Sequence, residues 1–392
     1  MDFQIIDQPE FTQEEIDDAL SRHGLLTFAL ELTKLCNYSC VYCYRETGIQ
    51  PSNELSLDEL FSASQQAIDL GARKAGIIGA GEPTLDKHLV PILEFLRGRI
   101  ENVTIFLKTL EKSKTVTHTP RIHGDRRAKP LYMEEKYGSK KISRVFSIFT
   151  NGSGINAKLA KILYDLKIKV ILKINSLDPL VHDTLVGKKG GYRLTMRGLD
   201  QLLNAGYPDA NHRLIIESVV TKTNLDGLPE LWCWCRERDF SPFFERLAPL
   251  GRATDGESLG VSPQQLFQLF NQLKHIDETR FGYKWTIQPP WSAQRCSRHF
   301  YNCHIDIEGN VLPCPGVDIP VGNIREKSLK DILASSQIIN DLRHIDERIK
   351  GTCATCELKR QCYGCRGTAY HVTGDYLASD PLCWKFNSEQ SI

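Results

Sequence analysis

Apolar residues along the middle of the chain follow two alternating periods. Short runs rich in Val, Ile, Leu and Phe predict six strands, at residues 26–32, 74–78, 145–149, 169–174, 214–220 and 243–247. Between several of them, apolar residues recur at helical spacing and predict helices at 57–70, 85–96, 157–166 and 194–205. Ser56 is expected to cap the first of these helices, with Glu59 completing a capping box. Strands that alternate with helices in this way predict an α/β fold with a parallel sheet and helices outside it.

The last third of the chain has a different pattern. Residues 303–314 alternate apolar and polar positions around Glu308, Gly309 and Asn310, which predicts a β-hairpin. Ser328 is the expected N-cap of a helix that follows it. We therefore divide the chain into an N-terminal extension (1–24), an α/β domain (25–255) and a smaller cysteine-rich α+β domain with its linker helix (256–392).

One connection does not fit the regular alternation. About 45 residues separate the second predicted helix from the next strand, where a few residues are typical. Within this insertion, assigned to residues 98–144, residues 108–144 carry eleven Lys or Arg and four Asp or Glu. We predict a solvated loop, and the alternative is a lid or docking site for an acidic substrate.

Composition narrows the classes of function. The 392 residues carry a net charge of +1, which argues against general binding of nucleic acids or membrane surfaces. No apolar run approaches the roughly 20 residues that span a bilayer, and the first ten residues do not resemble a signal peptide. The chain has thirteen cysteines, which without a signal peptide predict a reducing, cytoplasmic location and roles as metal ligands or catalytic groups.

Three of these cysteines, Cys36, Cys40 and Cys43, lie within eight residues. Their C-x3-C-x2-C spacing can hold three irons of a [4Fe–4S] cluster. The next cysteine is Cys233, so the fourth iron would remain open for an outside ligand. The alternative interpretation is three unrelated cysteines in a loop.

This spacing, with Tyr42 directly before the last cysteine and an apolar run at residues 25–32, resembles the radical S-adenosylmethionine (SAM) superfamily. The resemblance implies that SAM chelates the open iron and that one electron from the cluster releases a 5′-deoxyadenosyl radical. It also implies a partial (β/α)6 barrel with the active site at the carboxyl ends of the strands. An external electron donor such as flavodoxin or ferredoxin would be required.

The same resemblance assigns SAM contacts at the strand ends. Gly79, Gly81 and Glu82 form the family's glycine–glutamate–proline motif, in which Ala80 stands where many members have glycine. Thr150 and Asn151 follow the next strand, and a structural role in a turn explains them equally well as a functional role. Further SAM contacts are expected from Tyr42, Ser176, Ser218 and Leu250. The pattern indicates no catalytic base.

Eight more cysteines follow from residue 296 onward, enough for two fully ligated [4Fe–4S] clusters. Their order, C-x12-G-x4-C, then C-x2-C-x5-C-x2-C, then C-x17-C, is similar to the SPASM extension of radical SAM enzymes. Family members usually have three residues between the last two cysteines of the central group, and here there are two. The resemblance assigns one auxiliary cluster to Cys296, Cys303, Cys314 and Cys365, and the other to Cys353, Cys356, Cys362 and Cys383.

Two cysteine sets admit other interpretations. The four cysteines of the central group could together hold one Zn²⁺, although four others would then be unexplained. Cys233 and Cys235 lie on a helix predicted at 228–237 and are expected to be buried structural thiols. The alternative for this pair is a hydrogen donor to a substrate radical.

Together these features predict a radical SAM enzyme with three [4Fe–4S] clusters that oxidises an unactivated C–H position. The SPASM resemblance implies a peptide or protein side chain as substrate. Because only 35 residues precede Cys36, a separate leader-binding domain is not expected, so the alternative is a dehydrogenase or epimerase of a sugar or aminocyclitol. A multi-cluster electron carrier is a more distant alternative, since a carrier needs no SAM-binding motif.

Overall fold

The computed structural model describes residues 4–5, 10–45, 48, 53–98, 145–254, 256–288, 290–292 and 296–387. Apart from Gly98, the predicted basic insertion lies outside the described residues.

The six predicted strands are confirmed and form consecutive parallel neighbours of one sheet. Their bounds are β2 Thr27–Glu31, β3 Lys74–Ile78, β4 Val145–Thr150, β5 Ile168–Lys173, β6 Leu214–Val220 and β7 Ser241–Arg246. The last strand begins two residues before the prediction and includes Pro242. A proline is tolerated there because β7 is at one edge of the sheet.

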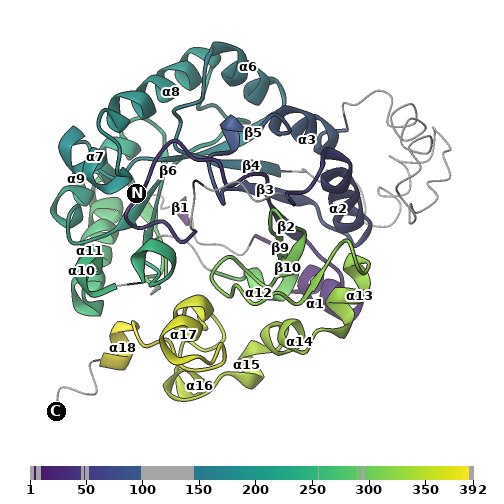
Figure 1. Ribbon diagram of the computed structural model, residues 1–392. Helices are drawn as coiled ribbons and strands as arrows, with labels where there is room; N and C mark the ends of the chain where they lie inside the picture. Colours follow the sequence, from purple (N-terminus) through teal and green to yellow (C-terminus); the bar gives the residue numbers. More distant parts are fainter. Residues whose placement is uncertain are drawn as a thin grey trace.

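Helices cover the outer face of these strands in an arc (Figure 1). They are α2 Leu57–Asp69, α3 Leu89–Leu96, α6 Ala157–Asp165, α7 Pro179–Val186, α8 Gly191–Ala205, α9 Leu228–Arg236, α10 Gly256–Leu259 and α11 Pro263–Ile276. The helix predicted at 85–96 begins at Leu89, because Asp86 accepts a hydrogen bond from the His88 N–H and forms a turn. The large hydrophobic core lies between this arc and the sheet, with Leu30, Ile77, Ile148 and Leu172 fully or almost fully buried.

The C-terminal region adds three strands to this same sheet. They are β9 Asn302–Ile305, β10 Asn310–Leu312 and β11 Gly322–Asn323. The predicted hairpin is confirmed, but β9 also pairs in parallel with β2, so the sheet has nine strands in the order β11-β10-β9-β2-β3-β4-β5-β6-β7. The sequence did not predict this continuation, because pairing between strands 275 residues apart leaves no local signal.

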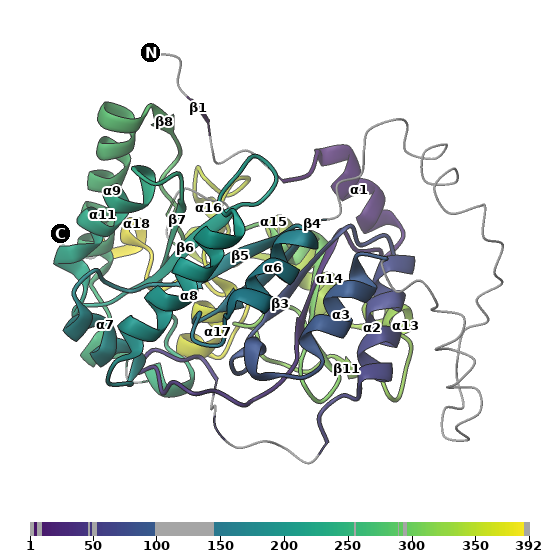
Figure 2. The ribbon, with the colours of Figure 1, turned by 90° about the horizontal axis from the view of Figure 1, so that it is seen from above.

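Short helices complete the C-terminal region and lie across the side of the barrel that the outer arc leaves open (Figures 1 and 2). They are α12 Arg298–Tyr301, α13 Leu329–Ser335, α14 Gln337–Arg343, α15 Ile345–Arg348, α16 Thr352–Thr355, α17 Arg366–Thr373 and α18 Trp384–Asn387. At the N-terminal side, α1 Gln13–Ser21 packs beside α12, while β1 Gln4–Ile5 and β8 Tyr283–Lys284 form a separate two-stranded sheet.

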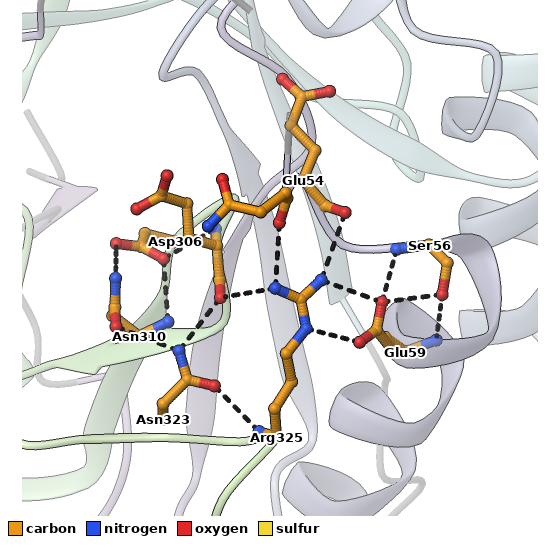
Figure 3. Close-up of polar contacts among 9 residues, drawn as sticks. Glu54, Ser56, Glu59, Asp306, Asn310, Asn323 and Arg325 are labelled. Atoms are coloured by element: carbon orange, nitrogen blue, oxygen red, sulfur yellow. Dashed lines mark hydrogen bonds and ion pairs between the residues drawn. The ribbon is translucent and has the colours of Figure 1, made fainter. Parts of the chain in front are cut away.

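Arg325, just after β11, connects the C-terminal hairpin to α2 (Figure 3). Its guanidinium forms an ion pair with Glu59 and donates to the backbone carbonyls of Asn53 and Glu54. Glu59 also completes the predicted capping box with Ser56, which is confirmed. The hydrogen bond from Arg325 holds the pKa of Glu59 at about 2. One side chain therefore ties the first barrel helix to the region that carries eight cysteines.

Replacing Arg325 with Ala should lower the apparent melting temperature by about 2 °C, because the ion pair is one-third exposed and solvent screens it. The folded-state pKa of Glu59 is depressed, so its contribution is complete at pH 7 and declines as pH falls below about 5. Scanning fluorimetry of wild type and variant at pH 7 and pH 4.5 measures both effects. Arg280→Ala, which removes an ion pair that is half exposed, is the control; equal melting temperatures for all three proteins would contradict a tethering role.

Candidate active site

The loop that carries Cys36, Cys40 and Cys43 follows β2 directly, and all three cysteines line one cavity. Burial raises the pKa of Cys36 to about 11 and that of Cys40 to about 12, and the neighbouring Cys43 thiol contributes to both increases. The three thiols are thus close enough to influence one another. Cluster assembly at this loop must displace their protons.

This donor set suits a cluster better than a single ion. Within the described ranges, no three His, Cys, Asp or Glu side chains are arranged to hold one metal ion. Thiolates that ligate different irons of a [4Fe–4S] cluster lie farther apart than the ligands of one ion, and three of them leave one iron open. The loop therefore fits the cluster that its spacing predicts.

The glycine motif packs directly against the cysteine loop. A Cβ atom on Gly81 would lie 2.2 Å from the carbonyl oxygen of Leu35, and one on Gly79 would lie 2.1 Å from the carbonyl oxygen of Gly81. The Glu82 N–H donates to the Leu35 carbonyl, and the Tyr44 hydroxyl donates to the Gly79 carbonyl. The glycines are needed because the backbone of the motif touches the backbone of the loop.

Glu82 is buried and accepts hydrogen bonds from two strand ends. The hydroxyl and N–H of Thr84 and the hydroxyl of Thr150 donate to one carboxylate oxygen, and the Asn151 N–H donates to the other. Burial raises the pKa of Glu82, and these hydrogen bonds oppose the rise. Because Glu82 also lines the cavity, the network holds its carboxylate in place beside the cysteine loop.

The remaining predicted SAM contacts divide into two groups. Tyr42 and Leu250 line the cavity, and the turn after Leu250 packs on the loop through a hydrogen bond from the Arg252 N–H to the Cys43 carbonyl. Ser176 and Ser218 do not line it. Ser176 accepts a hydrogen bond from the Asp178 N–H, and Ser218 is fully buried and accepts one from Asn224, so both serve the local loop structure. A direct contact of either serine with SAM remains a prediction.

The C-terminal cysteines form two groups. The first group, called the Cys296 group below, consists of Cys296, Cys314 and Cys365. All three line the same cavity as the N-terminal loop. Burial raises the pKa of Cys314 to about 12, and both Cys365 and Cys296 add to this rise. These three thiols are therefore close together, as the resemblance predicted for three of the four ligands of one auxiliary cluster.

Cys303, the fourth predicted ligand of that cluster, lies elsewhere. It is in β9, pairs with Phe28 of β2 and is fully buried in the core between the sheet and the outer helices. Burial raises its pKa to about 12, and Arg343 is the one charged group of the described chain that acts on it. Cys303 is not among the residues that line the cavity, whereas its neighbour Asn302 is, as the alternation of side chains along a strand explains. Its assignment as a ligand remains a prediction.

The second auxiliary group consists of Cys353, Cys356, Cys362 and Cys383. Burial raises the pKa of Cys362 to about 12, with further contributions from Cys383 and Cys353. Cys356 and Cys383 both act on the ammonium of Lys385, which places them together. Cys365 belongs to the first group, so the four cysteines of the central pattern do not form one zinc site.

Gly364 explains the shortened spacing between Cys362 and Cys365. Its φ is +66°, and a Cβ atom would lie 2.6 Å from the Cβ of Asp380. A left-handed glycine between the two cysteines turns the chain, which lets them reach different groups across only two intervening residues.

A cavity of about 2270 Å³ connects the two ends of the site. Both the N-terminal cysteine loop and the Cys296 group line it, as does an apolar belt formed by Ile171, Ile215 and Phe243. The C-terminal region therefore faces the same space as the predicted SAM site.

A charged layer in this cavity was not among the predicted site residues. Lys173, Glu217 and Glu245, from β5, β6 and β7, all line it. The Lys173 ammonium lies 2.9 Å from a Glu217 oxygen and 3.8 Å from a Glu245 oxygen. Burial and the neighbouring Glu217 raise the pKa of Glu245 to about 8, and Lys173 opposes that rise. Charged residues within otherwise apolar strands were the sequence signal that could have identified them.

Cys233 and Cys235 do not line the cavity. Cys235 is fully buried in the core beneath α9, as predicted. Cys233 is half-buried and accepts a hydrogen bond from Arg280, so it is less buried than expected. Neither position suits a hydrogen donor to a substrate radical.

Comparison with known proteins agrees with this arrangement. A model of the radical SAM superfamily matches residues 30–230, more than half of the chain. The chain belongs to the radical SAM superfamily. A second model, the SPASM iron–sulfur cluster-binding domain, matches residues 296–357. The cofactors of this radical SAM enzyme are accordingly SAM and [4Fe–4S] clusters.

Relatives of this radical SAM enzyme include proteins of different function. It is 24% identical over 385 residues to an AdoMet-dependent heme synthase from Methanosarcina barkeri, covering 91% of this chain and 95% of the relative. It is 24% identical over 384 residues to the mycofactocin maturase MftC of Mycolicibacterium smegmatis, covering 94% and 85%. The structure of Streptococcus suis SuiB bound to precursor peptide SuiA has a TM-score of 0.63 at 17% identity, covering 95% and 79%, and shows the shared fold. No helix within the described ranges is both long and apolar enough to cross a membrane.

Proposed function

We propose that this radical SAM enzyme oxidises an unactivated C–H position of its substrate, and that the second electron leaves through the SPASM region. The observation that carries this proposal is the single cavity lined by both Cys36, Cys40 and Cys43 and the Cys296 group. A substrate in that cavity lies between the site that would generate a radical and a site that would accept an electron.

The cysteine groups of the described chain would hold three clusters. Cys36, Cys40 and Cys43 would hold the SAM-binding cluster, and the Cys296 and Cys353 groups would hold one auxiliary cluster each. When bound, these cofactors supply hydrogen-atom abstraction by a 5′-deoxyadenosyl radical at one end of the cavity and one-electron acceptance at the other. The division of the chain near residue 255 into a barrel and a cluster domain remains part of this proposal.

Glu245 is the proposed proton acceptor. Net oxidation of a C–H position that ends in a new bond removes a hydrogen atom, one electron and one proton. Glu245 lines the cavity, and its raised pKa suits a group that both accepts and releases protons near neutral pH. Lys173, held by both carboxylates, would keep Glu217 and Glu245 in place and balance their charge.

For the substrate we propose a peptide or protein side chain. The cavity is larger than the roughly 300–1,000 Å³ of common small-molecule sites, and SAM and the clusters would occupy part of it. Relatives of similar sequence identity include the mycofactocin maturase MftC and the sporulation killing factor maturation protein SkfB.

A small molecule that carries carboxylates, such as a tetrapyrrole, is the second candidate. It is favoured by Lys169 and Arg213, which line the cavity beyond the apolar belt. Burial and the adjacent Arg213 lower the pKa of Lys169 to about 8, and no described carboxylate is within ion-pair distance of it. Two neighbouring cations that form no ion pair with a described carboxylate suit an anionic ligand, and some relatives are heme synthases.

A two-arm assay separates these candidates. Anaerobically reconstituted enzyme with SAM and dithionite is incubated with a synthetic precursor peptide encoded beside its gene, or with an iron porphyrin that carries propionates. We expect the peptide to increase 5′-deoxyadenosine formation and to become lighter by two hydrogens, measured by mass spectrometry. A product in the porphyrin arm alone would establish the second candidate. Absence of 5′-deoxyadenosine in both arms, with an intact reduced cluster, would favour an electron carrier.

A further inference from the structure

Arg246 is the last residue of β7 and connects the barrel to the C-terminal region. Its side chain is 6% exposed and lines the cavity next to Glu245. The guanidinium forms an ion pair at 2.9 Å with Asp380, which is completely buried. It also donates to the Thr368 hydroxyl and to the Leu382 carbonyl, each at 3.0 Å. These contacts hold one positive charge of the barrel inside the C-terminal region.

The residues that Arg246 contacts are hydrogen-bonded to a cysteine of one auxiliary group and adjacent in sequence to a cysteine of the other. Asp380 accepts a hydrogen bond from the Cys365 N–H at 2.8 Å, through the same oxygen that contacts Arg246. The Thr368 N–H donates to the Cys365 sulfur at 3.5 Å. Leu382, whose carbonyl Arg246 contacts, directly precedes Cys383. Arg246 is therefore bonded to residues beside one cysteine of the first group and one of the second.

Electrostatics supports the same placement. Burial lowers the pKa of Arg246, but Asp380, Cys365 and Cys383 together raise it above its ordinary value. The guanidinium thus interacts electrostatically with a cysteine sulfur of each group. Because water is largely excluded from this position, its charge acts with little screening. Asp380 brings an opposite charge to the same position.

We propose that the Arg246–Asp380 pair sets the reduction potentials of the two auxiliary clusters and thereby controls the electron's exit from the substrate cavity. A reduced cluster carries one more negative charge than an oxidised one. The cation of Arg246 stabilises the reduced form and raises the potential, whereas the anion of Asp380 lowers it. Arg246 also lines the cavity, and we assign it as a positioning residue because the proposed effect acts through its charge. This inference rests on the proposed ligand groups.

The test compares charge variants of the reconstituted full-length enzyme by redox titration followed with EPR. In Arg246→Gln, the ratio of reduced to oxidised auxiliary cluster at a fixed potential should fall at least tenfold, a shift of 59 mV for a one-electron couple. In Asp380→Asn, the ratio should rise by a similar factor. The double variant should return to within about threefold of wild type, because both charges are absent. Arg246→Lys keeps the charge and should behave like wild type.

The SAM-binding cluster is the internal reference, identified by the change of its EPR signal when SAM is added. Its potential should not change in these variants, and the exposed control Arg280→Gln should change nothing. Opposite shifts in the two single variants are the decisive result, since a purely structural pair would not produce them. Shifts of the same sign, or no shift, would overturn the inference and leave Arg246 and Asp380 as a buried structural ion pair.

Two measurements keep the result interpretable. If Arg246→Gln does not fold, Asp380→Asn still tests the sign of the effect, because its potential should rise, and Arg246→Lys is the charge-preserving control. Iron content of the wild type distinguishes failure of this inference from failure of the proposed function. About 12 Fe per chain with no shift overturns this inference alone, whereas about 4 Fe overturns the proposed function with it.

Discussion

Cys40→Ala should reduce dithionite-driven formation of 5′-deoxyadenosine at least 1,000-fold, to the background of enzyme-free controls. Three thiolates are the minimum that holds a [4Fe–4S] cluster with one open iron, and loss of one leaves the cluster unstable in a loop that opens onto a large cavity. Replacing Cys36, Cys40 and Cys43 together should remove about 4 of about 12 Fe and an equal amount of sulfide. Colorimetric iron and sulfide assays and chromatography of 5′-deoxyadenosine measure both effects.

Cys235→Ala is the matched control for that experiment. Cys235 is also buried, but it lies in the core beneath α9 and does not line the cavity. It should retain full iron content and SAM cleavage, at a cost of about 1–2 kcal/mol in stability. Wild-type levels of 5′-deoxyadenosine from Cys40→Ala would refute the assignment of the loop, and stoichiometric zinc with about 4 Fe or less would refute three clusters.

Cys314→Ala and Cys303→Ala should behave differently, although both residues are buried and both lie in the C-terminal hairpin region. Cys314 faces the cavity with Cys296 and Cys365, so its loss should remove up to about 4 Fe. SAM cleavage should continue, because the SAM-binding loop is intact, but oxidised product per 5′-deoxyadenosine should fall at least tenfold. Cys303 packs in the core, so Cys303→Ala should keep both iron and product ratio.

The comparison uses the substrate that the two-arm assay establishes, with product and 5′-deoxyadenosine quantified in the same sample. Circular dichroism and iron content check that Cys314→Ala is folded, since cluster ligation also contributes to folding. Equal iron loss in both variants would support Cys303 as a ligand. An unchanged product ratio in folded Cys314→Ala would instead make the first auxiliary cluster structural and favour a redox-neutral reaction such as epimerisation.

The contrast between Cys303 and its neighbours illustrates a limit of motif reasoning. Cys303 is only seven residues from Cys296 and eleven from Cys314, so spacing alone includes it in the same ligand group. The pairing of β9 with β2 places Cys303 beside Phe28, and both pack in the hydrophobic core. Strand register, as well as distance along the chain, determines which cysteines can meet.

The sequence by itself determined the strand and helix order, the SAM-binding loop, the glycine motif beside it and the presence of a second cysteine-rich region. These features depend on local periodicity or on ligands within a few residues, so the chain encodes them directly. Side chains whose role depends on neighbours from distant strands could not be found this way. Lys173, Glu217 and Glu245 come from three strands, and only the curved parallel sheet brings them into one charged layer.

Only the tertiary structure decided how the two cysteine-rich regions are related. Parallel pairing of β9 with β2 joins residues 275 positions apart, and Arg246 then reaches Asp380 across 134 residues. Such contacts form because they bury apolar strands and pair buried charges, and their free energy depends on the whole assembled surface and not on any local pattern. The motifs specify the cofactors, while the fold determines which thiols, carboxylates and cations share one cavity.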